Sequence, residues 1–261
     1  MEVIGMIETY DLTRYYGRKL AVENLNMTIG KGEVFGFIGP NGAGKTTTIR
    51  MLSCLIQPTR GTARVGGHDI LEEPLEVKRI VGLVPENPPL YDRLTGREYL
   101  EFVGMLYKVP ESGRKRRIDE LLEAFKLVDV ANQLIVTYSR GMKQKLAFSA
   151  AVIHSPKILF LDEPTAGVDV RSAKVMKDII KELSDGGITI LFSTHIMELA
   201  ERICRRVGII SEGRLIAVGT LDELKSRFSG TDLEDVLLKL TGGAEEQEII
   251  ESLRLEEGTS K

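Results

Sequence analysis

Residues 36–50 read GFIGPNGAGKTTTIR, and this stretch decides the fold. An apolar strand pattern over 34–38 precedes the spacing G-x-x-x-x-G-K-T, and an apolar helix pattern over 47–56 follows it. Glycines let consecutive backbone N–H groups turn toward phosphate oxygens, while Lys45 reaches the β- and γ-phosphates and the Thr46 hydroxyl holds Mg²⁺. The pattern therefore predicts a nucleotide site rather than an empty glycine-rich turn. Its expected lining is Gly39, Pro40, Asn41, Gly42, Ala43, Gly44, Lys45, Thr46 and Thr47.

Strand and helix patterns alternate along most of the chain. Apolar strand-like runs recur from IGMIETY (4–10) to LIAVG (215–219), and helical patterns separate several of them. This alternation predicts an α/β fold with a parallel-sheet core. Short strands separated by turns in the first third predict an N-terminal antiparallel β-subdomain, and the nearly all-helical region 88–155 predicts a helical insertion subdomain.

Capping boxes mark three of the expected helix starts. The pattern T-x-x-E occurs at Thr95, Thr220 and Thr231, where a threonine hydroxyl and a glutamate can satisfy the first free N–H groups of a helix. Pro110 and Gly113 are expected to break the helix that opens at Thr95.

Polar residues follow two later strand patterns. KILFLDEP (157–164) reads as a strand buried on both faces that ends in Asp162 and Glu163. Since ligands bind at the carboxyl ends of parallel strands, Asp162 is expected on Mg²⁺ and Glu163 is expected as the general base for the attacking water. His195 follows ITILFST at the same edge and is expected to contact the γ-phosphate. The alternative is a solvated acidic turn with a structural histidine.

The composition is that of a soluble globular protein. Apolar residues make up 43% and charged residues 28% of the chain, and the formal net charge is −3. This balance gives no overall attraction to nucleic acid, so no nucleic-acid partner is expected. No apolar run approaches the ~20 residues that cross a bilayer. Cys54 and Cys204 lie among apolar neighbours, which favours reduced thiols over a disulfide and agrees with the cytosol.

One helix start carries an unusual charge pattern. In YSRGMKQKL (138–146) Ser139 reads as the N-cap, yet Arg140 and Lys143 add positive charge where the helix dipole is already positive. Such cations mildly oppose the helix unless an anion approaches. Together, GPNGAGKT, YSRGMKQKL, LFLDEP, AGVD and STH occur in an order and spacing that resembles the ATP-binding cassette (ABC) ATPases, over about residues 5–225.

The resemblance implies a P-loop NTPase (RecA-like) core that binds and hydrolyses ATP and energises a separate membrane permease from the cytoplasmic face. In this family two subunits pair head to tail, here as a homodimer or with a paralogue. Each ATP then lies between one P-loop and the partner's signature, which assigns Ser139 and Gly141 to the partner's nucleotide and Asp169 to the dimer interface. Tyr16 matches the aromatic residue that stacks on adenine, with Tyr15 as its rival.

Two segments depart from the family pattern. The signature has Tyr138, Arg140 and Met142 where the usual LSGGQ has leucine, glycine and glutamine, and variants of the type YSRGM point to exporter-type permeases. Glu86 stands where a glutamine usually touches Mg²⁺ and the attacking water; a carboxylate can bind Mg²⁺ but adds negative charge near the triphosphate. The apolar loop from Pro88 to Leu94 is expected to dock the permease; the alternative is that its residues pack inside the chain.

The expected organisation is an ABC ATPase domain over 1–242, with the helical subdomain at about 88–155, and an acidic C-terminal tail over 243–261. The alternative function is a soluble ABC-type ATPase that acts on DNA or ribosomes without a membrane partner. Such relatives usually carry coiled-coil insertions, zinc-binding cysteines or two cassettes, none of which this sequence displays. A P-loop kinase would leave YSRGM and AGVD without a role.

Overall fold

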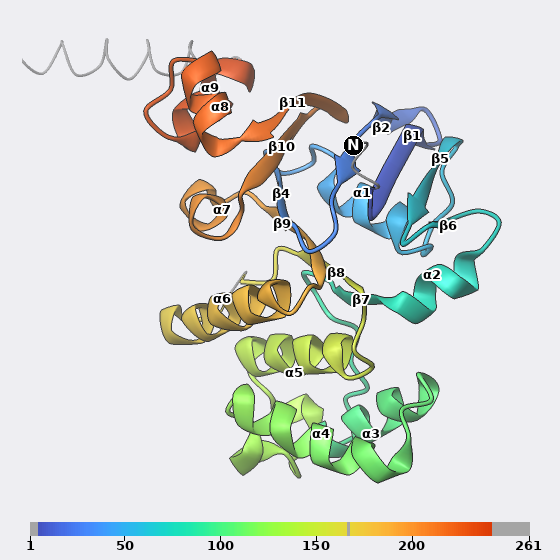
Figure 1. Ribbon diagram of the computed structural model, residues 1–261. Helices are drawn as coiled ribbons and strands as arrows, with labels where there is room; N and C mark the ends of the chain where they lie inside the picture. The colour runs from blue at the N-terminus through green and yellow to red at the C-terminus, as the bar shows by residue number, and fades with distance from the viewer. Residues whose placement is uncertain (1–4, 166–167, 242–261) are drawn as a thin grey trace, which may run out of the picture.

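The larger of two sheets forms the centre of the molecule. The computed structural model describes residues 5–165 and 168–241 (Figure 1). The strand order is β11-β10-β4-β9-β8-β7, and all neighbours run parallel except the hairpin of β10 and β11. The strands are β4 (Val34–Ile38), β7 (Val81–Val84), β8 (Ile158–Asp162), β9 (Thr189–Thr194), β10 (Arg206–Ser211) and β11 (Arg214–Thr220). The predicted parallel-sheet core is confirmed.

The smaller sheet is antiparallel and lies beside the N-terminal part of the core. Its strands are β1 (Ile7–Tyr16), β2 (Lys19–Leu25), β3 (Thr28–Ile29), β5 (Arg60–Val65) and β6 (His68–Asp69). The run AVENLNMTI splits into β2 and β3, because the Asn26 side chain accepts the Asp11 N–H (2.9 Å) in place of a backbone partner. The predicted antiparallel β-subdomain is confirmed.

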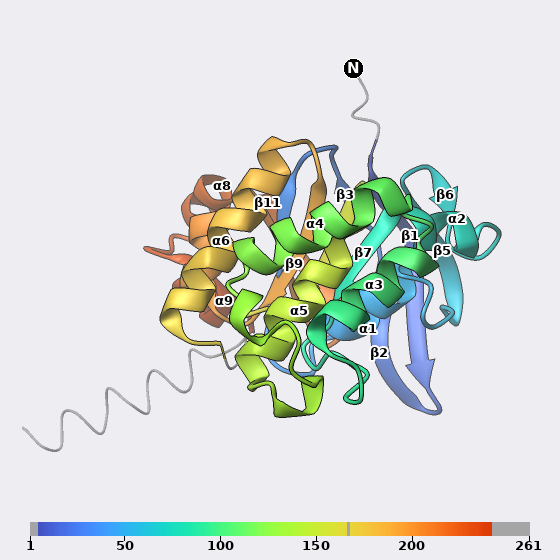
Figure 2. The same cartoon turned by 90° about the horizontal axis from the view of Figure 1, so that it is seen from below.

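Helices cover both faces of the central sheet and form a separate layer below it. Figure 1 and the view from below in Figure 2 place α3, α4 and α5 together on the side of the sheet away from β1 and β2. These three helices lie between β7 and β8 in the chain, inside the region expected to be a helical insertion. The helices are α1 (Lys45–Leu52), α2 (Pro74–Ile80), α3 (Gly96–Leu106), α4 (Glu111–Ala124), α5 (Arg140–Val152), α6 (Val170–Asp185), α7 (Met197–Ile203), α8 (Leu221–Arg227) and α9 (Leu233–Thr241).

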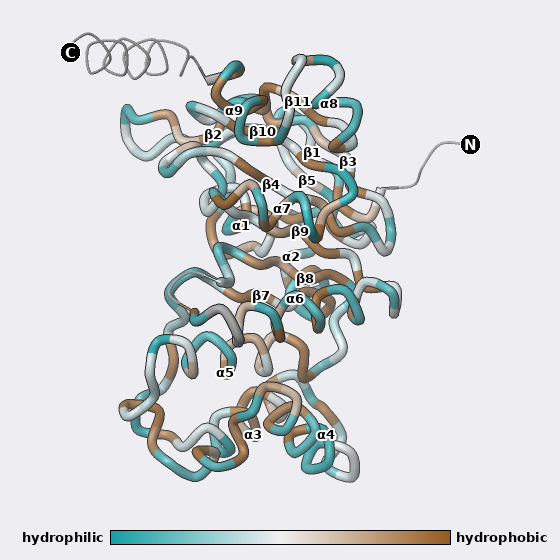
Figure 3. The backbone as a smooth tube through the Cα atoms, turned by 90° about the vertical axis from the view of Figure 1, so that its left-hand side faces the viewer, coloured by the Kyte–Doolittle hydropathy of each residue, from teal (hydrophilic) through white to brown (hydrophobic). Residues whose placement is uncertain are grey.

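The central strands send alternate side chains into two hydrophobic cores. In β8, Leu159 and Leu161 join the core on the helical side, whereas Ile158 and Phe160 join the core shared with the antiparallel sheet. This is the two-residue period of a strand, and because both faces are covered the strand reads as an unbroken apolar run. Figure 3 shows the resulting stack of layers, from β1 and β2 through the central strands to α3 and α4.

The capping boxes at Thr95 and Thr220 are present as predicted, but the third is wrong. Asp232 caps α9 instead of Thr231: its Oδ1 accepts the Asp235 N–H (2.9 Å), and the Thr231 hydroxyl donates to the Asp235 carboxylate. Aspartate caps a helix at least as well as threonine, so the local competition shifts the helix start by one residue.

Two helix bounds also differ from the sequence patterns. Gly113 does not break a helix. It lies in the first turn of α4, where its N–H donates to the Pro110 carbonyl (3.1 Å). The helix after the P-loop begins at Lys45 and ends at Leu52, since Cys54 takes a left-handed conformation (φ 56°). Within residues 5–165 and 168–241, no helix has the length and hydropathy required of a membrane span. The acidic tail predicted for 243–261 lies outside the described residues.

Candidate functional site

The parallel strands bring distant polar residues to one edge of the central sheet. β4, β9, β8 and β7 are neighbours in that order, and each carboxyl end leads into one of the predicted site segments. β4 enters the P-loop, β8 ends at Asp162 before Glu163, β9 leads to His195, and β7 leads to Glu86. The edge of the sheet therefore collects residues from four separate parts of the sequence, as expected for a ligand site in an open α/β sheet.

The P-loop takes a backbone path that requires glycine. A Cβ on Gly39 would lie 2.0 Å from the Ile210 carbonyl oxygen, and a Cβ on Gly44 would lie 2.6 Å from the Ala21 carbonyl oxygen. Gly44 also has φ 112°, a conformation that L side chains rarely adopt. The start of the loop, after β4, therefore packs closely on β10, and its end, before α1, packs closely on β2. Without side chains at these positions, the loop backbone can approach a ligand in the cavity.

Lys45 is held inside the loop. Its Nζ is buried and donates to the carbonyl oxygens of Gly39 (2.6 Å) and Pro40 (3.1 Å). Burial lowers the pKa of Lys45, and the nearby carboxylates of Glu163, Asp162 and Glu86 oppose that shift. A cation that bonds to its own loop can exchange those carbonyl contacts for phosphate oxygens, which are stronger acceptors because they are charged.

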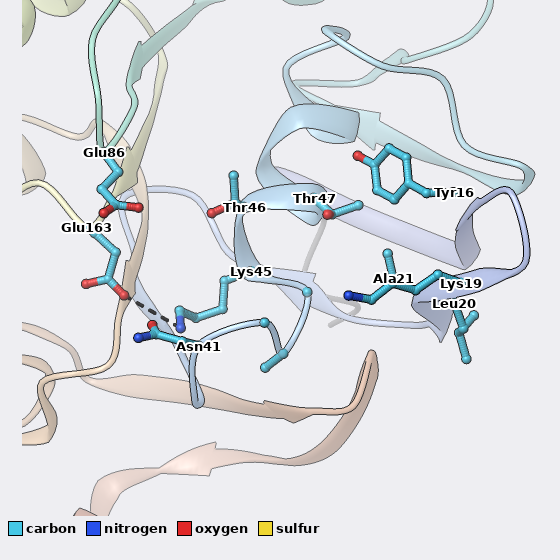
Figure 4. Close-up of a pocket in the computed structure, with 13 residues that line it drawn as sticks. Tyr16, Lys19, Leu20, Ala21, Asn41, Lys45, Thr46, Thr47, Glu86 and Glu163 are labelled. Atoms are coloured by element: carbon cyan, nitrogen blue, oxygen red, sulfur yellow. Dashed lines mark ion pairs between the residues drawn. The ribbon is translucent and has the colours of Figure 1, made fainter.

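A cavity of about 430 Å³ runs along the loop (Figure 4). Tyr16 stands at one end and Glu86 and Glu163 at the other, with the P-loop between them. Tyr16 is 43% exposed, and the Arg14 guanidinium lies 4.8 Å from its ring centroid, whereas Tyr15 is not part of the lining. The complete lining is Tyr16, Lys19, Leu20, Ala21, Asn41, Gly42, Ala43, Gly44, Lys45, Thr46, Thr47, Glu86 and Glu163.

The two acidic residues at the end of β8, Asp162 and Glu163, are both buried and both hydrogen-bond to Ser193. The Ser193 hydroxyl donates to Asp162 Oδ1 (2.7 Å) and accepts the Glu163 N–H (3.2 Å). Asp162 is paired with Ser193 in the register of β8 and β9, so the hydroxyl fixes both acids at the end of the strand. Ser193 was not predicted from the sequence, although its place just before Thr194 and His195 at the end of an apolar strand was a usable signal.

Glu163 carries a buried oxygen without a hydrogen bond. Its Oε1 lies 3.6 Å from Lys45 Nζ and 2.9 Å from His195 Nδ1, yet neither contact is aligned as a hydrogen bond. The residue has φ 48°, which turns its side chain toward the cavity. Because Glu163 lines the cavity and its Oε1 has no hydrogen bond, the carboxylate can accept one from a ligand such as water after a small movement of its side chain.

Oxygen donors for a cation meet beside the P-loop. Thr46, Asp162 and Glu86 line a small cavity of about 100 Å³ next to the main one. One hydroxyl and two carboxylates are ligand types that Mg²⁺ prefers, and Mg²⁺ bound with a nucleotide usually needs only one or two protein ligands. The residues present therefore fit the ion.

The three residues predicted to lie at a subunit interface are away from the P-loop cavity. Ser139 caps α5 by accepting the Met142 N–H (3.3 Å), as expected, and Asp169 caps α6 by accepting the Ser172 N–H (2.9 Å). The hydrogen bonds from Ser172 lower the pKa of Asp169. Neither these two residues nor Gly141 lines the cavity in the same chain. Their predicted roles depend on a second subunit and stay predictions.

Known proteins that resemble this chain identify its family. The ABC transporter family matches residues 22–166, more than half of the chain. The chain belongs to the ABC transporter family. It is also 39% identical over 236 residues to the linearmycin resistance ATP-binding protein LnrL of Bacillus subtilis (strain 168), covering 90% of this chain and 75% of that protein. The resemblance to ABC ATPases is thus confirmed.

Solved structures of the family have the same fold. An ATP-binding subunit of an ABC transporter superimposes with a TM-score of 0.85 at 34% identity, covering 90% of this chain and 99% of that one. A dimeric ATP-binding cassette in a post-hydrolysis state, bound to ADP and phosphate, has a TM-score of 0.77 at 25% identity and covers 83% of this chain and 99% of that one. This ABC protein is an ATP-binding and ATP-hydrolysing transporter subunit, and the soluble alternative is not supported.

Proposed function

We propose that this ABC subunit hydrolyses ATP at an interface between two copies of the chain, or between the chain and a paralogue, and drives an exporter-type permease. The observation that carries the proposal is the buried Glu163 carboxylate, which lines the P-loop cavity and whose Oε1 lies near Lys45 and His195 without a hydrogen bond. A carboxylate in this position can accept a proton from a water molecule that attacks the γ-phosphate.

Each residue at the edge of the sheet has a distinct part in this reaction. Lys45 neutralises the β- and γ-phosphates, Glu163 takes the proton of the attacking water, and His195, in contact with Glu163, orients the γ-phosphate. Thr46 and Asp162 would hold Mg²⁺, with Glu86 as a further oxygen ligand. When bound, Mg²⁺ neutralises charge that develops on the phosphate oxygens. Tyr16 stacks on adenine at the far end of the cavity.

The second half of the site comes from the partner subunit. Ser139 is exposed at the start of α5, a helix of 13 residues whose N-terminal N–H groups attract an anion. The solved dimeric cassette with ADP and phosphate supports a paired arrangement of this fold. Glu163 completes one side of the nucleotide, and Ser139 with Gly141 of the partner completes the other. ATP therefore holds the pair together, and its hydrolysis lets the pair open.

The interface role of Ser139 can be tested with Ser139→Arg in a hydrolysis-deficient background. The bulky side chain should leave ATP binding to the isolated subunit unchanged, but the ATP-dependent shift to a dimer in gel filtration should disappear. Thr220→Arg is the matched control, because Thr220 caps α8 in the same way and its loss also costs about 1 kcal/mol of helix stability. A dimer that persists in Ser139→Arg contradicts the trans site.

Export is the transport direction that the sequence similarity supports. LnrL is named for resistance to linearmycin, and a transporter that confers resistance by transport moves the drug out of the cell. By analogy, the permease driven by this chain exports a small molecule of the antibiotic class. The subunit then acts at the cytoplasmic face of the membrane, held there by the permease.

A cavity between the core and the helical layer offers a docking surface for the permease. It measures about 600 Å³ and lies between α2 and the end of α3. Leu75 and Leu106 are 67% and 63% exposed at its rim, which fits a partly apolar protein segment. The full lining is Leu75, Lys78, Arg79, Leu106, Tyr107, Lys108 and His154. Arg79 is paired with Glu76, but Lys78 and Lys108 add positive charge that favours a permease segment with acidic residues.

The loop from Pro88 to Leu94 is a weaker docking candidate than the cavity. Leu90 and Leu94 pack against the hydrophobic core, and exposed Tyr91 lies edge-on to Phe102 with 5.5 Å between ring centroids. Two of the apolar residues expected to contact the permease therefore pack within this chain instead. The cavity, by contrast, leaves its rim leucines uncovered.

The docking surface can be tested by co-purification with the permease that this subunit energises. The double variant Leu75→Asp, Leu106→Asp should lose the permease in detergent extracts and keep wild-type ATP binding, since both leucines lie outside the nucleotide cavity. Ile216→Asp is the control, because Ile216 is an exposed aliphatic residue (39%) on β11, away from α2 and α3. Undiminished co-purification of the double variant contradicts this surface.

A further inference from the structure

The first turn of α5 is tied to the loop that follows β7. Lys143 Nζ lies 2.8 Å from Asp92 Oδ1, and the buried Gln144 side chain donates to the Pro85 carbonyl (3.3 Å). These contacts join the signature segment to the segment that carries Glu86 within a single chain. The two segments therefore hold a defined relative position before any partner subunit arrives.

Arg140 extends this connection to Glu86 itself. The Arg140 guanidinium lies 4.0 Å from Glu86 Oε1, and both residues line a cavity of about 320 Å³ between the two segments. Glu86 also lines the P-loop cavity with Lys45 and Thr46. Its carboxylate thus borders the nucleotide on one side and Arg140 on the other. These are the two positions at which the sequence departs from the family pattern toward charge.

The positive charge of Arg140 offsets the unfavourable effect of the Glu86 carboxylate on triphosphate binding. A carboxylate at the edge of the cavity repels an incoming triphosphate. A guanidinium 4.0 Å from that carboxylate attracts it toward α5 and so holds it back from the triphosphate. An exposed pair of this kind adds little to the stability of the fold.

We propose that Arg140 is a positioning residue for the nucleotide site of its own chain, where it serves as the counter-charge of Glu86. The proposal rests on the proposed function only in placing ATP in the P-loop cavity; it needs no partner subunit. Arg140 therefore acts in cis, through Glu86, whereas its neighbour Ser139 acts in trans on the partner's nucleotide.

A double-mutant cycle on the isolated subunit tests this pairing. ATP binding is measured by calorimetry in EDTA, at protein concentrations where sedimentation shows only monomer. Arg140→Gln should weaken ATP binding roughly fivefold in the wild-type background, because the Glu86 carboxylate, no longer held by the guanidinium, can then turn toward the triphosphate. In the Glu86→Gln background the same Arg140→Gln change should have no effect. Arg140→Lys should retain the affinity, since it keeps the charge.

Lys143→Gln is the matched control for charge. It removes the same charge from the same turn of α5, but the carboxylate partner of Lys143, Asp92, does not line the P-loop cavity. Its affinity should stay at the wild-type value. An equal loss for Arg140→Gln in both Glu86 backgrounds, an equal loss for Lys143→Gln, or no loss at all overturns the pairing. These outcomes leave the trans site untouched, because dimerisation of Ser139→Arg tests that site separately.

Discussion

Glu163→Gln should lower ATP turnover at least about a hundredfold, the usual scale for removal of a general base, while ATP binding stays near the wild-type level. Glutamine keeps the size of the side chain and its place beside Lys45 and His195, but it cannot accept the proton of the attacking water. The expected signature is slow phosphate release together with an ATP-bound dimer that survives gel filtration. Phosphate release and calorimetric ATP affinity measure the two effects separately.

The control for this variant must account for the unusual backbone at Glu163. Glu212 also has a left-handed conformation (φ 49°), but it lies in the turn between β10 and β11 and not in the cavity. Glu212→Gln therefore changes the same charge at the same kind of backbone position and should keep normal turnover. A Glu163→Gln enzyme that hydrolyses ATP at the wild-type rate would assign the base to another group.

The parts of the fold that depend on near neighbours in the sequence could be predicted. The P-loop, the apolar run before Asp162 and the cap at Ser139 each depend on a few consecutive residues and on the period of a strand or helix. Strand direction then placed Glu163 at the phosphate end of the sheet, because neighbouring parallel strands share one edge. Where two caps compete, as at Thr231 and Asp232, the same local logic failed by one residue.

The contacts that tune the site could not be predicted, because they join residues far apart in the sequence. Ser193 meets Asp162 only through the register of β8 and β9. The approach of Arg140 to Glu86 depends on how α5 packs on the end of β7, and a local pattern contains no information about that packing. In the sequence both residues appeared only as separate departures from the family pattern. In the structure these two residues form one ion pair.

Lys45→Ala should weaken ATP binding at least about a hundredfold, the largest effect on affinity that we expect from one side chain. Two charge-assisted hydrogen bonds to phosphate contribute about 1.5–3 kcal/mol each, and every 1.4 kcal/mol is about tenfold in affinity. The folded chain should tolerate the change, because burial lowers the pKa of Lys45 and so already disfavours its charged form. Calorimetry with Mg-ATP measures the loss.

Lys19→Ala separates this effect from the general positive charge of the cavity. Lys19 lines the same cavity, but it is exposed at the start of β2, where solvent screens its charge. Its removal should therefore weaken binding by no more than about threefold, within the range of a single exposed charge. Equal losses in Lys19→Ala and Lys45→Ala would mean that ATP responds to the net charge of the cavity, and unchanged affinity in Lys45→Ala would mean that the P-loop lysine does not hold the phosphates.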